Sequence, residues 1–176
     1  MITTIRSARP EDAAALAALA AQTFALACPP GTTQAAIDDF IARTLSERNF
    51  ADYLADPQRE LLFAEVAGVP AGYTMIVHAA PTDPDVAAVV TARPATELSK
   101  CYVLEGFHGA GVGKALIEAS VDAARERGSA AIWLGVNQHN DRANRFYAKS
   151  GFEVVGSKKF LVGEKWEDDF VRLRPL

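Results

Sequence analysis

One short stretch of this sequence, a glycine-rich turn between an apolar segment and a helical pattern, constrains the fold more than any other. Residues 102–114 read Tyr-Val-Leu-Glu-Gly-Phe-His-Gly-Ala-Gly-Val-Gly-Lys. Glycines at three alternate positions, Gly109, Gly111 and Gly113, let the backbone approach a ligand closely. The apolar residues that follow recur at helical spacing, so a helix begins at this turn. Unpaired N–H groups and the helix dipole make a helix start an anion site, so we expect a phosphate there.

Two common phosphate-binding motifs do not fit this turn. A Walker A loop requires a glycine five residues before Gly113 and a Ser or Thr after Lys114, but His108 and Ala115 stand there. The dinucleotide fingerprint requires a third glycine where Lys114 stands, and it usually opens a unit of a parallel sheet. Two alternatives remain: a phosphate of another ligand, or a tight strand–helix turn that binds nothing.

The rest of the chain shows alternating strand and helix patterns. Strands are expected over residues 2–6, 60–66, 71–77, 98–104, 130–136, 152–161 and 170–173. Helices are expected over residues 10–27, 33–46, 141–150 and from the glycine turn to about residue 127, with a shorter piece near residues 50–54. Several prolines predict a loop over residues 80–95. This order predicts a single α/β domain over residues 1–176, with a mixed, mostly antiparallel sheet flanked by helices on both faces.

Composition and charge exclude several kinds of partner. The chain has 176 residues, 49% of them hydrophobic, which suffices for a core without disulfides or a structural metal. A net charge of −4 argues against nucleic-acid binding, which usually needs a basic patch. The alanine-rich run at residues 13–27 is too short to span a bilayer and follows no positively charged leader. Cys28 and Cys101 show no metal-ligand spacing, so we expect a cytoplasmic protein with no metal and no membrane contact.

Residues 108–113 resemble the Gln/Arg-x-x-Gly-x-Gly/Ala signature of the GNAT N-acetyltransferases, although His108 stands where that family usually has Gln or Arg. Residues 130–152 resemble the family's second block, in which a strand, Asn140, a short helix with Tyr147 and a Gly-Phe pair follow one another. Together the two blocks imply a GNAT-like fold and a transferase that uses acetyl-CoA as its co-substrate. They also imply acetyl transfer to an amine by direct attack in a ternary complex.

The same resemblance implies roles for individual residues in binding coenzyme A. The turn would hold its pyrophosphate through His108, Gly109, Ala110, Gly111, Val112, Gly113 and Lys114. The backbone of Cys101, Tyr102 and Val103 would pair with the pantetheine arm like an added strand. Asn140 would contact coenzyme A and also suits the N-cap of the helix that follows it.

Acetyl transfer also needs groups that move protons. Tyr147 has an ordinary pKa of about 10, above the roughly 8.5 of a thiol, and the resemblance makes it the acid that protonates the leaving thiolate. Some relatives carry a glutamate base where this chain has Gly135. Glu97 is our first substitute for that base and His139 the second. A solvated surface role is the simpler one for either residue, and a water relay would need no single base. Cys101 as a nucleophile in a ping-pong route is a weaker alternative, because no His–Asp partner is identifiable.

The sequence constrains the identity of the acceptor amine less than it constrains the fold or the cofactor. Within the superfamily the chain looks most like the PaiA-type polyamine acetyltransferases, which implies a spermidine- or spermine-like acceptor. Four acids near the N-terminus could attract a polycation, although a solvated helix face is their simpler role: Asp38, Asp39, Glu47 and Asp52. A protein N-terminus, an amino acid or an aminoglycoside stays open as acceptor, as does a catalytically decayed acyl-CoA-binding sensor. A homodimer through the C-terminal strand pair is also compatible.

Overall fold

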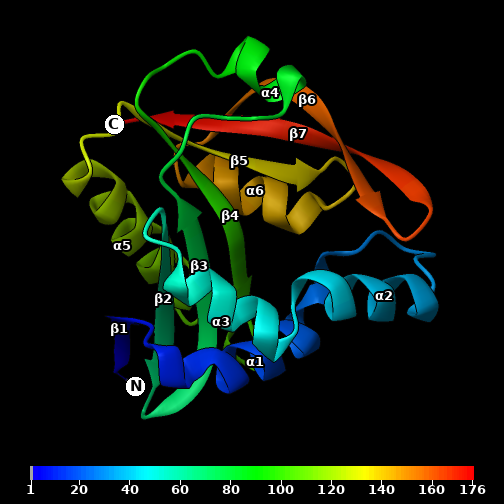
Figure 1. The fold of residues 1–176 in the computed structure, drawn as a ribbon, viewed down its shortest axis with the longest axis vertical. Coiled ribbons are helices and arrows are strands. Elements are labelled where there is room, and N and C mark those ends of the chain that lie inside the picture. The colour runs from blue at the N-terminus through cyan, green and yellow to red at the C-terminus, as the bar shows by residue number, and fades with distance from the viewer. Residues whose placement is uncertain (1) are drawn as a thin grey trace.

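The computed structural model describes residues 2–176 and contains one seven-stranded sheet in the order β1-β2-β3-β4-β5-β7-β6 (Figure 1). Neighbouring strands are antiparallel except for the parallel pair β4–β5. The strands are β1 (Thr3–Ser7), β2 (Arg59–Val66), β3 (Val69–Val77), β4 (Ala95–Val103), β5 (Ala131–Asn137), β6 (Glu153–Val162) and β7 (Lys165–Pro175). The expected mixed, mostly antiparallel sheet is confirmed.

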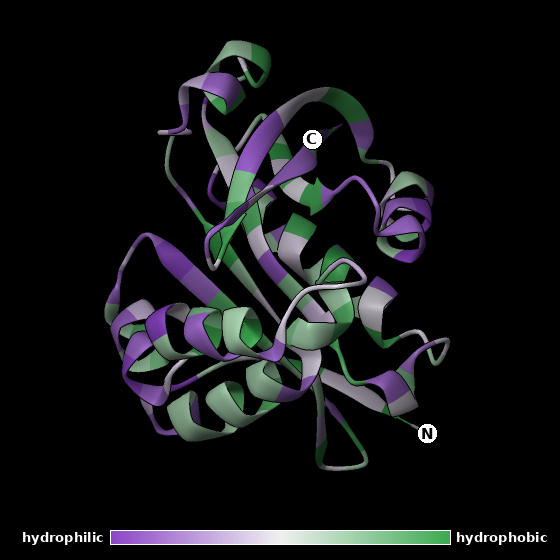
Figure 2. Ribbon diagram, turned by 90° about the vertical axis from the view of Figure 1, so that its right-hand side faces the viewer, coloured by the Kyte–Doolittle hydropathy of each residue, from purple (hydrophilic) through white to green (hydrophobic). Residues whose placement is uncertain are grey.

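Helices cover both faces of the sheet, as predicted. They are α1 (Ala13–Ala27), α2 (Gln34–Thr44), α3 (Glu47–Ala55), α4 (Pro84–Val89), α5 (Val112–Glu126) and α6 (Asp141–Lys149). Successive residues of a strand point to opposite faces. Leu61 and Phe63 of β2 therefore pack with α1, α2 and α3, whereas Leu62 lies in the cluster with Leu116 of α5. Polar and apolar residues occur on the same helices, as expected when one side of a helix packs on a sheet (Figure 2).

The loop predicted over residues 80–95 is wrong in part, because it contains α4. A proline suits the first position of a helix, where no N–H is needed. Pro84 occupies that position, and the preceding Asp83 caps the helix by accepting a hydrogen bond from the Asp85 N–H at 2.9 Å. Val86 and Val90 are fully buried against Trp133 of β5. Burial of this apolar side, rather than propensity, stabilises so short a helix.

The last strand is longer than predicted. β7 begins at Lys165, five residues before the expected start at Phe170. The acidic stretch before Phe170 belongs to this strand, because Glu167 and Asp169 are buried and Asp168 between them is exposed, which is strand alternation. β6 and β7 form a long hairpin that reaches α2, as Figure 1 shows at the right of the molecule. Four apolar side chains of this hairpin are exposed, and a homodimer through these two strands would bury them: Val154, Val155, Leu161 and Trp166.

Within residues 2–176, no helix combines the length and the apolar character needed to cross a bilayer.

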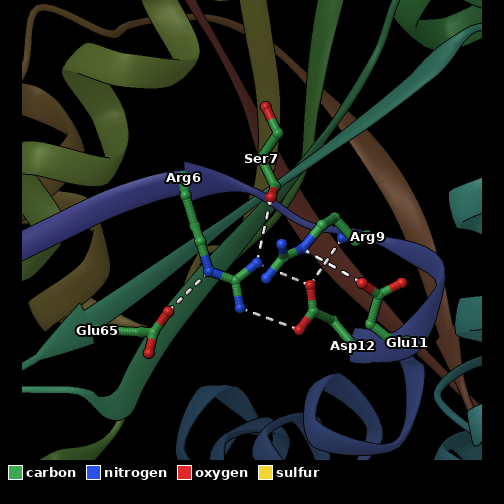
Figure 3. Close-up of polar contacts among 6 residues, drawn as sticks. All are labelled: Arg6, Ser7, Arg9, Glu11, Asp12 and Glu65. Carbon is green, nitrogen blue, oxygen red and sulfur yellow. Dashed lines mark hydrogen bonds and ion pairs between the residues drawn. The ribbon is translucent and has the colours of Figure 1, made fainter.

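An ion-pair network holds the entry to α1 against the sheet (Figure 3). Arg6 of β1 donates to both carboxylate oxygens of Asp12, at 2.8 and 3.0 Å, and its Nε donates to Glu65 of β2 at 2.7 Å. Asp12 also accepts the Arg9 backbone N–H at 2.7 Å. The Arg6 hydrogen bonds are the main reason that the pKa of Asp12 is lowered to about 2. The charged carboxylate therefore links the first strand, the first helix and β2.

Replacing Asp12 by asparagine is expected to lower the free energy of unfolding at pH 7 by about 2 kcal/mol, as for other hydrogen bonds to charged groups. Because the folded-state pKa of Asp12 lies below its unfolded value, the ionised carboxylate stabilises the wild type above the unfolded pKa. That contribution disappears as the pH falls toward 2. Urea unfolding at pH 7 and at pH 2–3 measures both effects. The control is Glu11→Gln, which breaks only the exposed Arg9–Glu11 pair; an equal loss in both variants would contradict the assigned role.

Candidate active site

The two central strands separate after a short ladder. β4 and β5 pair at Ala95–Ala131, Thr96–Ile132 and Glu97–Trp133, and no later pair follows in the described chain. On its other edge β4 stays paired with β3, with a bulge between Leu98 and Lys100. Beyond Glu97, one edge of β4 therefore has no partner on β5, and Figure 1 shows β4 and β5 running in diverging directions.

The gap forms a cleft of about 600 Å³ that contains most of the predicted site residues. The predicted residues that line it are Glu97, Cys101, Tyr102, Val103, His108, Gly109, Gly111, Gly113, Lys114, Asn140 and Tyr147. Two predicted cofactor residues lie outside this lining: Ala110 is exposed on the turn, and Val112 is fully buried in the core. The structure thus gathers both sequence blocks around one cleft.

The glycine turn has the geometry expected of an anion cradle. Gly109 and Gly111 have φ values of 81° and 82°, a left-handed conformation that side chains rarely adopt. Gly111 is the N-cap residue of α5, and the space where its side chain would stand is empty. Lys114 lies exposed in the first turn of that helix. Free N–H groups, a helix dipole and a nearby cation fit the pyrophosphate of coenzyme A.

His108 connects this turn to the end of β4. Its Nε2–H donates to the Val103 carbonyl oxygen at 2.8 Å, and its Nδ1 is buried without a partner. Where the resembling family has Gln or Arg, this chain therefore uses an imidazole to fix the turn against the strand. The departure from the signature leaves the backbone cradle intact.

Helix α6 brings Tyr147 to the cleft. Asn140 caps this helix by accepting a hydrogen bond from the Ala143 N–H at 3.2 Å. The Tyr147 ring packs edge-on against Phe152, with centroids 6.1 Å apart, and its hydroxyl lies beside the Cys101 thiol. Burial raises the pKa of Tyr147 well above its ordinary value, and the neighbouring Cys101 adds to this. The hydroxyl therefore stays protonated over the working pH range and is available as a proton donor.

Cys101 is poorly suited to act as a nucleophile. Burial raises the pKa of its thiol to about 12, and the interaction with Tyr147 offsets this only in part. Because the thiolate is the nucleophilic form, almost none is present near neutral pH. This observation favours direct transfer over the ping-pong alternative.

The side of the gap opposite to Tyr147 carries charged side chains that were not predicted from the sequence as site residues. Lys158 of β6 lies 3.9 Å from Asp169 of β7, and both side chains are largely buried. Lys100 of β4 is also partly buried, with its ammonium 5.5 Å from the centre of the Tyr53 ring. Burial raises the pKa of Asp169 to about 6 and lowers that of Lys100 to about 8. Only the register of the last strands brings Lys158 and Asp169 to the cleft.

Glu97 lies at the closed end of the cleft, in the last β4–β5 pair. Burial raises its pKa, whereas Lys158, Lys100 and Arg59 oppose that shift. His139, the second substitute base, is exposed and does not line the cleft.

The four acids considered as a polycation attractor lie away from this cleft. On α2, Asp39 pairs with Arg43 at 3.0 Å, and Asp38 accepts a hydrogen bond from Gln34 at 2.8 Å. On α3, Glu47 and Asp52 are exposed. The geometry therefore supports the simpler role, in which these acids belong to solvent-exposed helix faces.

Among residues 2–176, no group of three or more His, Cys, Asp and Glu side chains is arranged to hold a metal ion.

The sequence and the fold are similar to those of known acetyltransferases. Residues 24–152 match the acetyltransferase (GNAT) family model. An uncharacterized N-acetyltransferase of Mycobacterium tuberculosis is 44% identical over 165 residues, covering 94% of this chain and 98% of that protein. One of Lactobacillus delbrueckii is 28% identical over 160 residues, covering 90% of this chain and 89% of that protein. The crystal structure of the PaiA N-acetyltransferase from Thermoplasma acidophilum with coenzyme A superposes with a TM-score of 0.78 at 18% identity, covering 100% of both chains.

The chain belongs to the GNAT acetyltransferase family. It is an acetyl-CoA-dependent N-acetyltransferase with the fold of that family, and acetyl-CoA is its co-substrate.

Proposed function

We propose that this enzyme transfers the acetyl group of acetyl-CoA to the primary amine of a small acceptor by direct attack in a ternary complex. The pyrophosphate of coenzyme A binds at the turn formed by residues 108–114, where N–H groups of the α5 start are free. The pantetheine arm extends along the open edge of β4 at residues 101–103, where β5 no longer pairs. Asn140 borders the same cleft and contacts the cofactor from α6.

Tyr147 is the general acid of the proposed reaction. The acceptor nitrogen attacks the thioester carbonyl carbon, the N–C bond forms and the C–S bond breaks. Tyr147 supplies a proton to the leaving sulfur, and solvent then restores the hydroxyl. Its place beside Cys101, on the edge assigned to pantetheine, supports this role, and its raised pKa keeps the hydroxyl protonated before the reaction.

The observation that carries the small-acceptor proposal is a contact between the β6–β7 hairpin and α2. These two elements close the side of the cleft opposite to Tyr147, which we call the acceptor side. Phe160 of β6 packs on Phe40 of α2, with ring centroids 5.5 Å apart, and both line the cleft. At the tip of the hairpin, a side chain added at Gly163 would approach Ala36 of α2 to 2.9 Å. The β6–β7 hairpin and α2 therefore meet, as Figure 1 shows, where an extended peptide would need an open groove.

Two observations bear on the acceptor class. The resemblance of the sequence to the PaiA-type polyamine acetyltransferases makes a polyamine the first acceptor to test. The charges on the acceptor side are balanced, because Lys100 and Lys158 accompany Glu97 and Asp169. This balance favours an acceptor that brings a single ammonium into the cleft, such as an amino acid or one end of a longer amine.

The test is a free-thiol release assay with acetyl-CoA and a panel of spermidine, spermine, amino acids, aminoglycosides and short peptides, together with calorimetric titration of coenzyme A. We expect coenzyme A binding and thiol release with at least one small amine, and little release with peptides. Efficient acetylation of a peptide alone would contradict the small-acceptor proposal. Coenzyme A binding without release on any amine would favour a sensor instead, and absence of binding would remove the turn from the site.

A further inference from the structure

The proposed reaction needs a group that accepts a proton from the acceptor nitrogen. An alkylamine with an ordinary pKa near 10.4 is almost wholly protonated at neutral pH. Position 135 of β5 cannot supply this group, because it is Gly135. Two carboxylates line the cleft below the surface: Glu97, which is partly buried, and Asp169, which is buried. Glu97 lies on β4 and Asp169 on β7, so they reach different parts of the cleft.

Asp169 occupies the space beside the empty position on β5. A Cβ atom built on Gly135 would lie 3.2 Å from Asp169 Oδ2 and 2.5 Å from Lys158 Cε. Asp169 sits opposite Asn137 in the β5–β7 register, well beyond the last β4–β5 pair. Its carboxylate therefore enters the gap between β4 and β5 from β7, beyond the point where β4 and β5 stop pairing.

Asp169 also approaches the gap from the face opposite to Tyr147. Cys101 and Tyr102 are consecutive on β4, so their side chains leave opposite faces of the strand. Cys101 and Tyr147 pack against the same apolar cluster, whereas Tyr102 packs against the cluster on the other face of the sheet. Asp169 is among the charged groups that act on the Tyr102 hydroxyl. A thioester in the gap at this level has the phenol on one face and the carboxylate on the other.

Glu97 is less well placed for the same task. It belongs to the last paired step of β4 and β5, at the closed end of the cleft. Three cations act on its carboxylate, namely Lys158, Lys100 and Arg59.

We propose that Asp169 is the general base that takes the proton from the acceptor nitrogen, and that Lys158 tunes it. The inference deepens the proposed function and rests on it. The acceptor ammonium first loses one proton to solvent, which leaves a neutral amine with a free lone pair. As the N–C bond forms and the C–S bond breaks, the second nitrogen proton passes to Asp169 Oδ2, and the sulfur receives a proton from Tyr147, which regains one from solvent. Asp169 then releases its proton to solvent, and the products are the acetylated amine and free coenzyme A.

The electrostatic surroundings of Asp169 suit this task. Burial is the main cause that raises its pKa to about 6, Lys158 opposes the rise, and Glu167 and Asp168 on its own strand add to it. Tyr102 faces it across the gap as a neutral phenol, because burial raises its pKa. A carboxylate with this pKa is ionised at pH 7–8 yet is a stronger base than an ordinary aspartate.

The test is the pH dependence of kcat/KM between pH 5 and 9 with the best acceptor of the panel. We expect the wild-type rate to rise through about pH 6. Asp169→Asn should lower kcat/KM about 100-fold at pH 7 and remove that acidic limb, with the Kd of acetyl-CoA unchanged. Asp169→Glu should keep a limb. Lys158→Gln should move the limb to higher pH, because the cation that favours the ionised carboxylate is gone.

Glu97→Gln is the decisive comparison. Loss of the limb in that variant, with rate and limb retained in Asp169→Asn, would overturn the proposal. A wild-type profile without an acidic limb, or a limb unmoved by Lys158→Gln, would also overturn it. Coenzyme A binding with no thiol release from the wild type on any amine would instead refute the proposed function, so the two failures are distinguishable.

Discussion

Replacing Gly111 by glutamate is expected to weaken coenzyme A binding by about 100-fold or more, equivalent to nearly 3 kcal/mol. The position lies at the N-cap of α5, whose first N–H groups form the proposed phosphate site. A glutamate there places bulk and a negative charge in space that the glycine leaves empty. Calorimetric titration of coenzyme A into the purified variant measures the loss. Unchanged affinity in a correctly folded Gly111→Glu protein would mean that the turn does not hold the phosphates.

Two further variants separate charge from backbone strain. Gly111→Gln has the same left-handed strain and nearly the same bulk but no charge, so it should lose less affinity than Gly111→Glu. Gly128→Glu is the matched control, because Gly128 also has positive φ, with open space around it, but lies at the other end of α5. It should lose about 1–2 kcal/mol of stability and keep its affinity for coenzyme A.

Replacing Tyr147 by phenylalanine is expected to lower kcat by about 10² to 10⁴-fold while the Kd of acetyl-CoA stays close to that of the wild type. The substitution removes only the hydroxyl, so the ring keeps its packing against Phe152. Steady-state kinetics with the best acceptor and calorimetry with acetyl-CoA measure the two quantities. Because the pKa of Tyr147 is raised well above 10, the wild-type rate should show no alkaline loss below about pH 9 from this group.

Tyr53→Phe provides the control for a lost phenolic hydroxyl. The Tyr53 hydroxyl donates to the Thr44 carbonyl oxygen at 2.8 Å, between α2 and α3, and Tyr53 does not line the cleft. This variant should keep kcat while losing a little stability. A kcat for Tyr147→Phe equal to that of Tyr53→Phe would eliminate the proton-donor role.

The site residues that could be predicted from the sequence are those that belong to short local patterns. Left-handed glycines and the start of α5 fall within a few residues of each other, so Gly109 and Gly111 could be recognised without a structure. Asn140 precedes its helix by one residue, and Tyr147 follows it at fixed helical spacing. These features depend on backbone conformation and helix periodicity, which short sequences encode.

Asp169 depends instead on the pairing of strands that are far apart in the sequence. Its place beside Gly135 follows from the β5–β7 register, and Lys158 arrives through the β6–β7 register. Strand register is set by tertiary packing and cannot be read from one strand. Starting the last strand at Phe170 also hid the alternation that buries Asp169, and reading Pro84 as a loop signal hid α4.

The three-pair ladder between β4 and β5 has a consequence for how long the protein survives. Where the strands part, the backbone donors and acceptors of β4 have no partner on β5. In the proposed complex the pantetheine arm supplies those hydrogen bonds in place of water. A ligand that binds only the folded chain stabilises it by about 2.7 kcal/mol at 100 times its Kd. On the proposed mode of binding, the acetyl-CoA concentration sets part of the free energy of unfolding, and a lower concentration raises the fraction of unfolded chain that a protease can cleave.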